Sequence, residues 1–248
     1  MTSNSLAGRV GRTHNWSVDP WAETANDDVT VGVNPAGEAD LLDSDDDWWL
    51  VACMDWPRDR WIGYVQGYWK AAAVIVERVA DTGRDQDYLV YPFMMCWRHY
   101  VELQLKVLTL LAATYLRKPC DLPRTHKIDH LWRVARPLIE HAYPTDPTTD
   151  LDRIEHVLLQ LHGFDPTSEH FRYPILKDGS ETLTSLGRVH MRRFHIAMED
   201  VAGLLDGAET GIRVMIDERN EYESAVHGNS DGYHLVSSQA DKPQASQP

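Results

Sequence analysis

Three charged residues spaced four apart interrupt an otherwise apolar stretch, and they are the first candidates for chemistry. Arg98, Glu102 and Lys106 are the only formal charges in the segment WRHYVELQLKVLTLLAATYL. Because residues four apart share one side of a helix, these side chains form a single stripe. The stripe is either a salt-bridged solvent face, in which each pair contributes about 0.3–0.5 kcal/mol, or a face turned towards a second copy or a partner protein.

Two histidines and an Arg-Tyr pair are candidates for binding. His126 and His130 lie four apart near the start of the next predicted helix, a spacing that can bind zinc. The sequence places no third ligand, so no metal site is predicted, and the alternative is that both histidines pack or hydrogen-bond locally. Arg172 and Tyr173 either hold a loop against the rest of the protein or contribute to a binding site.

The elements that must position these residues are helices. Apolar residues recur at helical spacing through most of the chain, and strand patterns are scarce. The fold class predicted is therefore all-α, a single bundle of five or six helices in which the central helix is the most buried. The first four helices are expected over residues 58–80, 93–116, 125–139 and 149–163.

A last helical region is expected over residues 184–222. Gly203, Gly207 and Gly211 are expected to bend or split it, because glycine disfavours helix. The domain organisation that follows is a disordered acidic segment over residues 1–47, the bundle over residues 48–225, and a flexible tail over residues 226–248.

The charge is acidic and unevenly distributed. The chain of 248 residues has a formal net charge of −14, and residues 1–49 hold ten acidic residues against two arginines. Non-specific binding to a phosphate backbone needs clustered lysine and arginine. The balance therefore disfavours RNA as a partner without excluding a small local RNA or nucleotide site.

The sequence lacks the patterns that are typical of several classes of protein. Three cysteines form neither a metal-type pair nor an even disulfide set, which indicates a reduced, cytoplasmic protein. The longest apolar run, over residues 107–116, is too short to cross a bilayer, so no membrane role is expected. No phosphate-binding loop, dinucleotide motif or zinc-protease motif is present, and no cofactor is predicted.

The order of elements resembles the HEPN superfamily of small helical bundles. The resemblance covers roughly residues 58–222 and rests on the pieces RHYVELQLKVLTLL, THKIDHLW and FRYP. Similar helices in that family carry a Glu shortly before a Lys, a His near the start of the next helix, and an Arg-Tyr ahead of a turn. The residues in those places here are Glu102, Lys106, His126 or His130, Arg172 and Tyr173.

The resemblance implies a metal-independent endoribonuclease as one activity, with sites that usually form across a dimer. The family motif is an Arg, usually followed by a polar residue, with four to six residues between that Arg and a His. The pairs Arg98-His99 and Arg219-Asn220 have the right dipeptide, but no His follows Arg98 at an allowed spacing. After Arg219 the next histidine is His227, with seven residues between.

This departure favours a non-catalytic or catalytically decayed HEPN-like protein. The expected role is contact with other proteins, and the resemblance implies bacterial defence or stress regulation as the setting. The first alternative is an endoribonuclease that uses Arg219, Asn220 and His227, or Arg98 with a histidine from elsewhere. The second alternative is a nucleotide or small-ligand binding module. A homodimer is also expected, with the charged stripes of two copies facing each other.

Overall fold

Five helices make up the described part of the protein. The computed structural model describes residues 51–54 and 59–237, with side chains up to residue 226. The prediction of an all-α bundle with five or six helices is confirmed, and the disorder predicted for residues 1–47 lies outside the described residues. The helices are α1 (Arg60–Thr82), α2 (Gln86–Tyr115), α3 (Ile128–Ala142), α4 (Thr149–Phe164) and α5 (Met191–Ser237).

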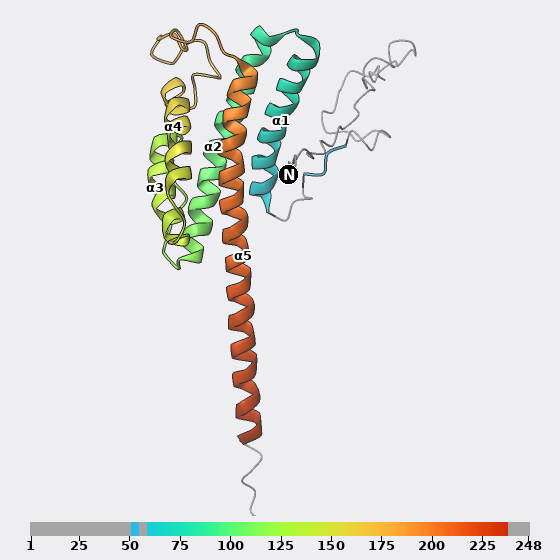
Figure 1. The fold of residues 1–248 in the computed structure, drawn as a ribbon, viewed down its shortest axis with the longest axis vertical. Helices are drawn as coiled ribbons and strands as arrows, with labels where there is room; N and C mark the ends of the chain where they lie inside the picture. The colour runs from blue at the N-terminus through green and yellow to red at the C-terminus, as the bar shows by residue number, and fades with distance from the viewer. Residues whose placement is uncertain (1–50, 55–58, 238–248) are drawn as a thin grey trace, which may run out of the picture. The chain divides into compact units, whose positions relative to one another are not determined.

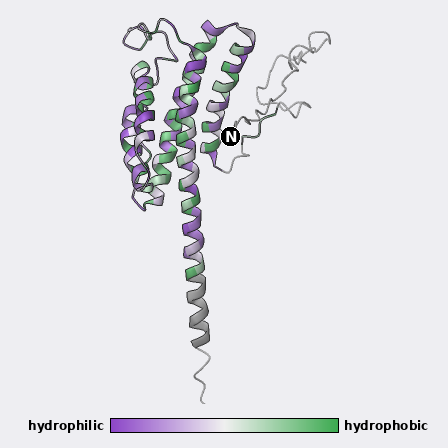
Figure 2. Ribbon diagram, viewed as in Figure 1, coloured by the Kyte–Doolittle hydropathy of each residue, from purple (hydrophilic) through white to green (hydrophobic). Residues whose placement is uncertain are grey.

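Helix α2 is the centre of the bundle. It packs against α1, α3 and α5, while α4 packs against α3 and α5 (Figure 1). Its core side chains include Phe93, Trp97, Leu105 and Leu108, all fully buried, and it holds more buried residues than α1, α3 or α4. Along the bundle, hydrophobic and hydrophilic residues alternate within each helix, as expected when one side of a helix faces a core (Figure 2).

The ends of α1 follow from local capping. Asp59 accepts a hydrogen bond from the backbone N–H of Trp61 at 3.0 Å, which satisfies one of the free donors of the first turn. Gly83 follows the helix with φ of 63°, and its N–H donates to the carbonyl of Val79. Glycine suits this left-handed position, and the helix ends at Thr82, two residues beyond the predicted residue 80.

The last helix differs from the prediction. Helix α5 begins at Met191 and not at residue 184, and it continues without a break to Ser237, so the glycines do not split it. Val201, Leu205 and Ile212 are buried on its inner side, and this packing outweighs the cost of about 1 kcal/mol for each helical glycine. Gly211 is needed there, because a Cβ at that position would lie 2.2 Å from the hydroxyl oxygen of Tyr143.

The connection between α4 and α5 is an ordered loop. It contains an isolated antiparallel bridge between Ile175 and Glu181, and the hydroxyl of Thr182 donates to the carbonyl of Tyr173 at 2.6 Å. None of the described helices is both long enough and apolar enough to span a membrane.

Candidate functional site

The charged stripe of α2 is buried inside the chain. Arg98 and Glu102 are each 1% exposed and Lys106 is 8% exposed. Both interpretations of the stripe from the sequence, a solvent face and a face covered by a second copy, are therefore wrong. The covering segments are the connection between α2 and α3 and the loop that follows α4, and both belong to the same chain.

Arg98 joins α2 to these two segments. Its Nη1 donates to Glu102 Oε2 at 2.8 Å, and its Nη2 donates to the carbonyl oxygen of His126. Its Nε lies 3.5 Å from both Oδ2 and the carbonyl oxygen of Asp165. Burial lowers the pKa of Arg98, while the carboxylates of Glu102 and Asp165 raise it. The guanidinium therefore remains a cation, held by partners within the protein.

Glu102 accepts hydrogen bonds from three cationic or ring nitrogens. Arg98 occupies its Oε2, and its Oε1 lies 2.8 Å from Lys106 Nζ and 2.7 Å from His126 Nδ1. Burial alone would raise the pKa of Glu102. The hydrogen bonds from Lys106 and His126 and the nearby positive charges outweigh burial, so the pKa lies below its ordinary value. Glu102 is thus a carboxylate at neutral pH.

His126 is the exposed member of this group. Its side chain is 65% exposed although its Nδ1 bonds to a carboxylate that is 1% exposed. An ionised Glu102 can only accept, so Nδ1 carries the proton and a neutral ring keeps its lone pair on Nε2. A buried carboxylate that orients an exposed imidazole in this way is an arrangement suited to general acid–base chemistry.

The two histidines predicted as a pair are not equivalent. Helix α3 begins at Ile128, later than the predicted residue 125, so His126 lies in the connection before the helix. His130 lies in the first turn of α3 and is exposed. Within the described residues, no group of three or more His, Cys, Asp or Glu side chains gathers as metal ligands would.

Asp165 is a member of the group that the sequence did not indicate. It follows the last residue of α4, and its Oδ1 accepts the backbone N–H groups of Glu169 at 2.9 Å and His170 at 3.1 Å. These bonds form a turn that fixes the carboxylate beside Arg98. The sequence FDPTS at this point carries the usual signal of such an aspartate turn, but not the partner 67 residues away.

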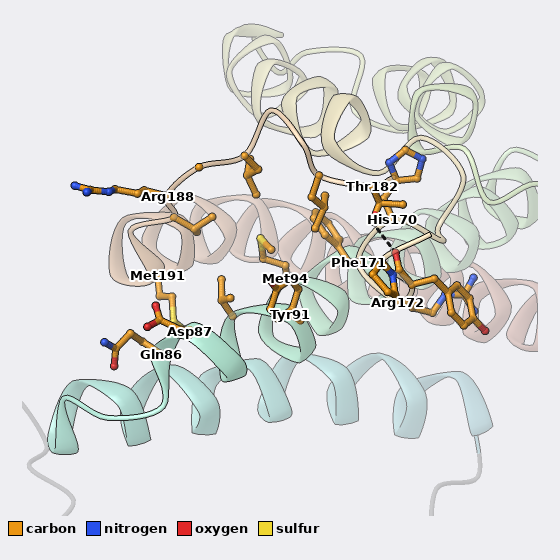
Figure 3. Close-up of a pocket in the computed structure, with 17 residues that line it drawn as sticks. Gln86, Asp87, Tyr91, Met94, His170, Phe171, Arg172, Thr182, Arg188 and Met191 are labelled. Atoms are coloured by element: carbon orange, nitrogen blue, oxygen red, sulfur yellow. Dashed lines mark hydrogen bonds between the residues drawn. The ribbon is translucent and has the colours of Figure 1, made fainter. Parts of the chain in front are cut away.

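Arg172 and Tyr173 lie in the loop after this turn. Arg172 Nε donates to the carbonyl of Ser168, and its guanidinium lies 5.6 Å from the ring centre of Tyr173. The charge of Arg172 is near enough to Arg98 to contribute to lowering its pKa. Both residues line a pocket between this loop and the start of α2, shown in Figure 3.

The remaining sequence candidates lie elsewhere or have other roles. His99 is half-buried, and its ring meets that of Tyr68 on α1 edge-to-face at 4.4 Å. Burial is the largest cause that lowers the pKa of His99, which favours a neutral ring. Its packing against α1 is a structural role.

Arg219 and Asn220 lie far from the buried group. Arg219 donates to the carbonyl of Tyr115 at 2.7 Å, and Asn220 is exposed and uses its own carbonyl to accept from Ser224. Tyr115 is about 25 Å along α2 from Arg98, at 1.5 Å per residue. The structure therefore does not bring the two arginine pairs of the sequence together, and the side chain of His227 lies outside the described part.

The connection between α2 and α3 is locally basic. Lys118, Arg124 and Lys127 are exposed there, close in sequence to His126, and the only acidic residue between Lys118 and Lys127 is Asp121. Among the described residues none of the three takes part in an ion pair with a carboxylate within 4.0 Å. This local positive charge contrasts with the acidic balance of the whole chain.

Comparisons with known proteins do not identify a family for this chain. No family model matches the chain, and no match was found among curated proteins or solved structures. The resemblance to the HEPN superfamily therefore stays a prediction, and the site is interpreted from its own geometry.

Proposed function

We propose that Glu102 and His126 form the acid–base centre of a metal-independent endoribonuclease. The observation that carries this proposal is the 2.7 Å contact between a buried carboxylate oxygen and Nδ1 of an imidazole that is 65% exposed. From the sequence, the non-catalytic role was favoured because no histidine follows Arg98 at the family spacing. In the folded chain His126, from the connection between α2 and α3, lies beside Arg98. This contact favours the endoribonuclease alternative.

The chemistry needs a base, a proton source and a cation. His126 Nε2 removes the proton of a 2′-hydroxyl, the 2′-oxygen attacks the adjacent phosphorus, and the bond to the 5′-oxygen breaks. The leaving 5′-oxygen takes a proton from the imidazolium or from water, and the product carries a 2′,3′-cyclic phosphate. The nucleophile belongs to the substrate, so the base and its orienting carboxylate are the main requirements.

Arg98 is a positioning residue in this proposal. In the family motif the arginine contacts the phosphate, but here Arg98 is 1% exposed and bonded to Glu102, Asp165 and the carbonyl of His126. The phosphate-binding role falls to exposed cations near His126. Arg124 and Lys127 flank it in the chain and can reach a phosphate without leaving an internal partner.

A second candidate is the non-catalytic role in protein contacts, and helix α5 favours it. Its C-terminal part continues past the helices on which its first part packs (Figure 1). Tyr222 is 71% exposed and Val226 is 48% exposed on this part. Exposed apolar side chains on a projecting helix suit a partner protein better than a substrate. Bacterial defence or stress regulation is the setting that the resemblance implies for this role.

The experiment that separates the two candidates is RNA cleavage by the purified protein in EDTA, with a single-stranded substrate labelled at both ends. Replacing His126 by Gln should reduce the cleavage rate about 100-fold or more, because general-base catalysis contributes about 10²–10⁴-fold. His130→Gln is the matched control, since that histidine is also exposed and lies four residues away. It should retain activity within about threefold.

Two outcomes would reject the enzymatic proposal. One is a wild-type protein that leaves the RNA intact under these conditions. The other is cleavage that is equally fast in wild type and His126→Gln, which would point to a contaminating nuclease. Either result would leave protein contacts through α5 as the better account.

A further inference from the structure

The pocket lined by Arg172 and Tyr173 lies between the first turns of α2 and the loop that joins α4 to α5, and His126 is not among its lining residues. Its volume is about 750 Å³. Small-molecule sites are typically about 300–1,000 Å³. Figure 3 shows that the α2 side chains and the loop side chains converge on this space from opposite sides.

The floor of the cavity is apolar. Met94 is 1% exposed, Phe171 is 4% exposed and Met191 is 7% exposed, and all three line the space. Val90, Leu186 and Val189 complete this surface. The part of a ligand that covers this floor is best matched by an apolar body, since polar groups placed there would lack partners.

The two ends of the cavity differ in charge. Figure 3 shows His170 and Arg172 at one end, while Arg188 lies at the other end, on the side of Asp87. Asp87 is the one carboxylate among the lining residues, and it lies at the end with Arg188. No carboxylate lines the end with Arg172, so that end is the positive one among the lining residues.

Arg172 is also available for a ligand. Its Nε is used by the carbonyl of Ser168, which fixes the direction of the side chain. Among the described residues its two terminal nitrogens have no hydrogen-bond partner. A guanidinium that is held at Nε and open at its terminal nitrogens matches the two oxygens of a carboxylate.

We propose that this cavity binds a small carboxylate with an apolar body, with the carboxylate against Arg172 and the body over Met94 and Phe171. The site is separate from the Glu102–His126 pair, and the proposal does not depend on nuclease activity. The ligand would contact residues 170–172, which are joined to Asp165 by consecutive hydrogen bonds within residues 165–172. Binding is therefore expected to stabilise the folded protein as well.

The probe for this proposal is decanoate, with decan-1-ol and decylamine as controls of the same chain length. Isothermal titration calorimetry on the full chain should show one decanoate per protein with a dissociation constant below about 1 mM, which is about −4 kcal/mol. Decan-1-ol should bind at least tenfold more weakly and decylamine more weakly still. Decanoate should also raise the thermal unfolding midpoint.

The variants locate the carboxylate. Arg172→Gln should weaken decanoate binding at least tenfold, while Arg188→Gln, at the other end of the same cavity, should change it by less than threefold. Lys177→Gln removes a positive charge from the same loop outside the cavity and should have no effect. Arg172→Lys keeps the charge and tests whether the fork geometry matters; it should retain part of the affinity.

Three results would overturn the proposal: decanoate that does not saturate the protein, decylamine that binds as tightly as decanoate, or an Arg172→Gln variant with unchanged affinity. If Arg172→Gln unfolds, the Arg172→Lys variant and the comparison of the three probes on wild type still decide the matter. None of these binding results bears on the nuclease proposal, so either proposal can fail while the other stands.

Discussion

Removing Arg98 should destabilise the protein far more than the removal of an exposed arginine. Arg98→Met replaces the guanidinium by a shorter, uncharged side chain, and Glu102 and Asp165, each 1% exposed, lose the cation that joins them. Breaking a buried ion pair by removing one partner costs about 3–5 kcal/mol, because the carboxylates left behind stay buried with fewer partners. A solvent-exposed helical pair would contribute only about 0.3–0.5 kcal/mol.

The matched control is Arg153→Met. Arg153 is also paired with two carboxylates, Asp150 at 3.5 Å and Asp200 at 3.1 Å, but its side chain is 51% exposed. Such surface pairs contribute about 0–1 kcal/mol. The two variants thus remove the same chemical group from two networks that differ mainly in burial.

Urea unfolding followed by circular dichroism measures both losses, and coincidence with tryptophan fluorescence tests two-state behaviour. For a protein of this size the loss in Arg98→Met corresponds to about 6–20 °C in the thermal midpoint. If Arg98→Met costs less than about 1 kcal/mol and behaves like Arg153→Met, the buried network is not a stabilising feature, and the argument that it positions His126 fails with it.

Two further predictions follow from particular contacts, and a third concerns assembly. The pKa of Glu102 is lowered in the folded protein, so its ionised form adds stability that is complete above the ordinary glutamate pKa of about 4.3 and is lost as pH falls through the lower folded pKa. The difference in unfolding free energy between wild type and Glu102→Gln should accordingly shrink in acid, and a constant difference from pH 7 to pH 3 would contradict this. Gly211→Ala should cost about 1–3 kcal/mol because its Cβ would displace the Tyr143 hydroxyl from its 3.0 Å bond to the carbonyl of Ala208. Gly207→Ala, where nothing lies within 4 Å of the new Cβ, should instead stabilise by about 0.5–1 kcal/mol, and equal effects in thermal unfolding would refute the contrast. Light scattering at tens of micromolar tests the homodimer expected from the sequence, although the charged stripe that suggested it is buried within one chain. Twice the chain mass of 28.3 kDa would support the dimer, and the mass of one chain would reject it.

The sequence predicts the helices and the grouping of Arg98, Glu102 and Lys106, because both depend on spacing along one helix. It does not predict that the group is buried. A charged stripe on an apolar helix has the same pattern whether solvent, a second copy or another segment of the chain covers it. The cover here comes from His126 and Asp165, which lie 28 and 67 residues from Arg98 in the chain.

The last helix shows a second limit. Gly203, Gly207 and Gly211 reduce helix propensity locally, which led to the prediction of a bend or a split. The packing of Leu205 and Ile212 is a property of the folded bundle, and it overrides propensities of about 1 kcal/mol. The close approach of Tyr143 to Gly211 likewise joins α5 to a residue that follows α3 and is visible only in three dimensions.

The central claim is that the imidazole of His126 is the acid–base group, and chemical rescue tests it most directly. His126→Ala removes a ring that is 65% exposed, so it leaves an opening to solvent beside the Glu102 carboxylate into which free imidazole can enter. The account predicts that His126→Ala cleaves RNA at least about 100-fold more slowly than wild type. It also predicts that added imidazole restores a large part of the rate in this variant, with 2′,3′-cyclic phosphate ends, and leaves His130→Ala unaffected. Cleavage by His126→Ala at the wild-type rate, or a lost rate that imidazole does not restore in a folded variant, would contradict the account.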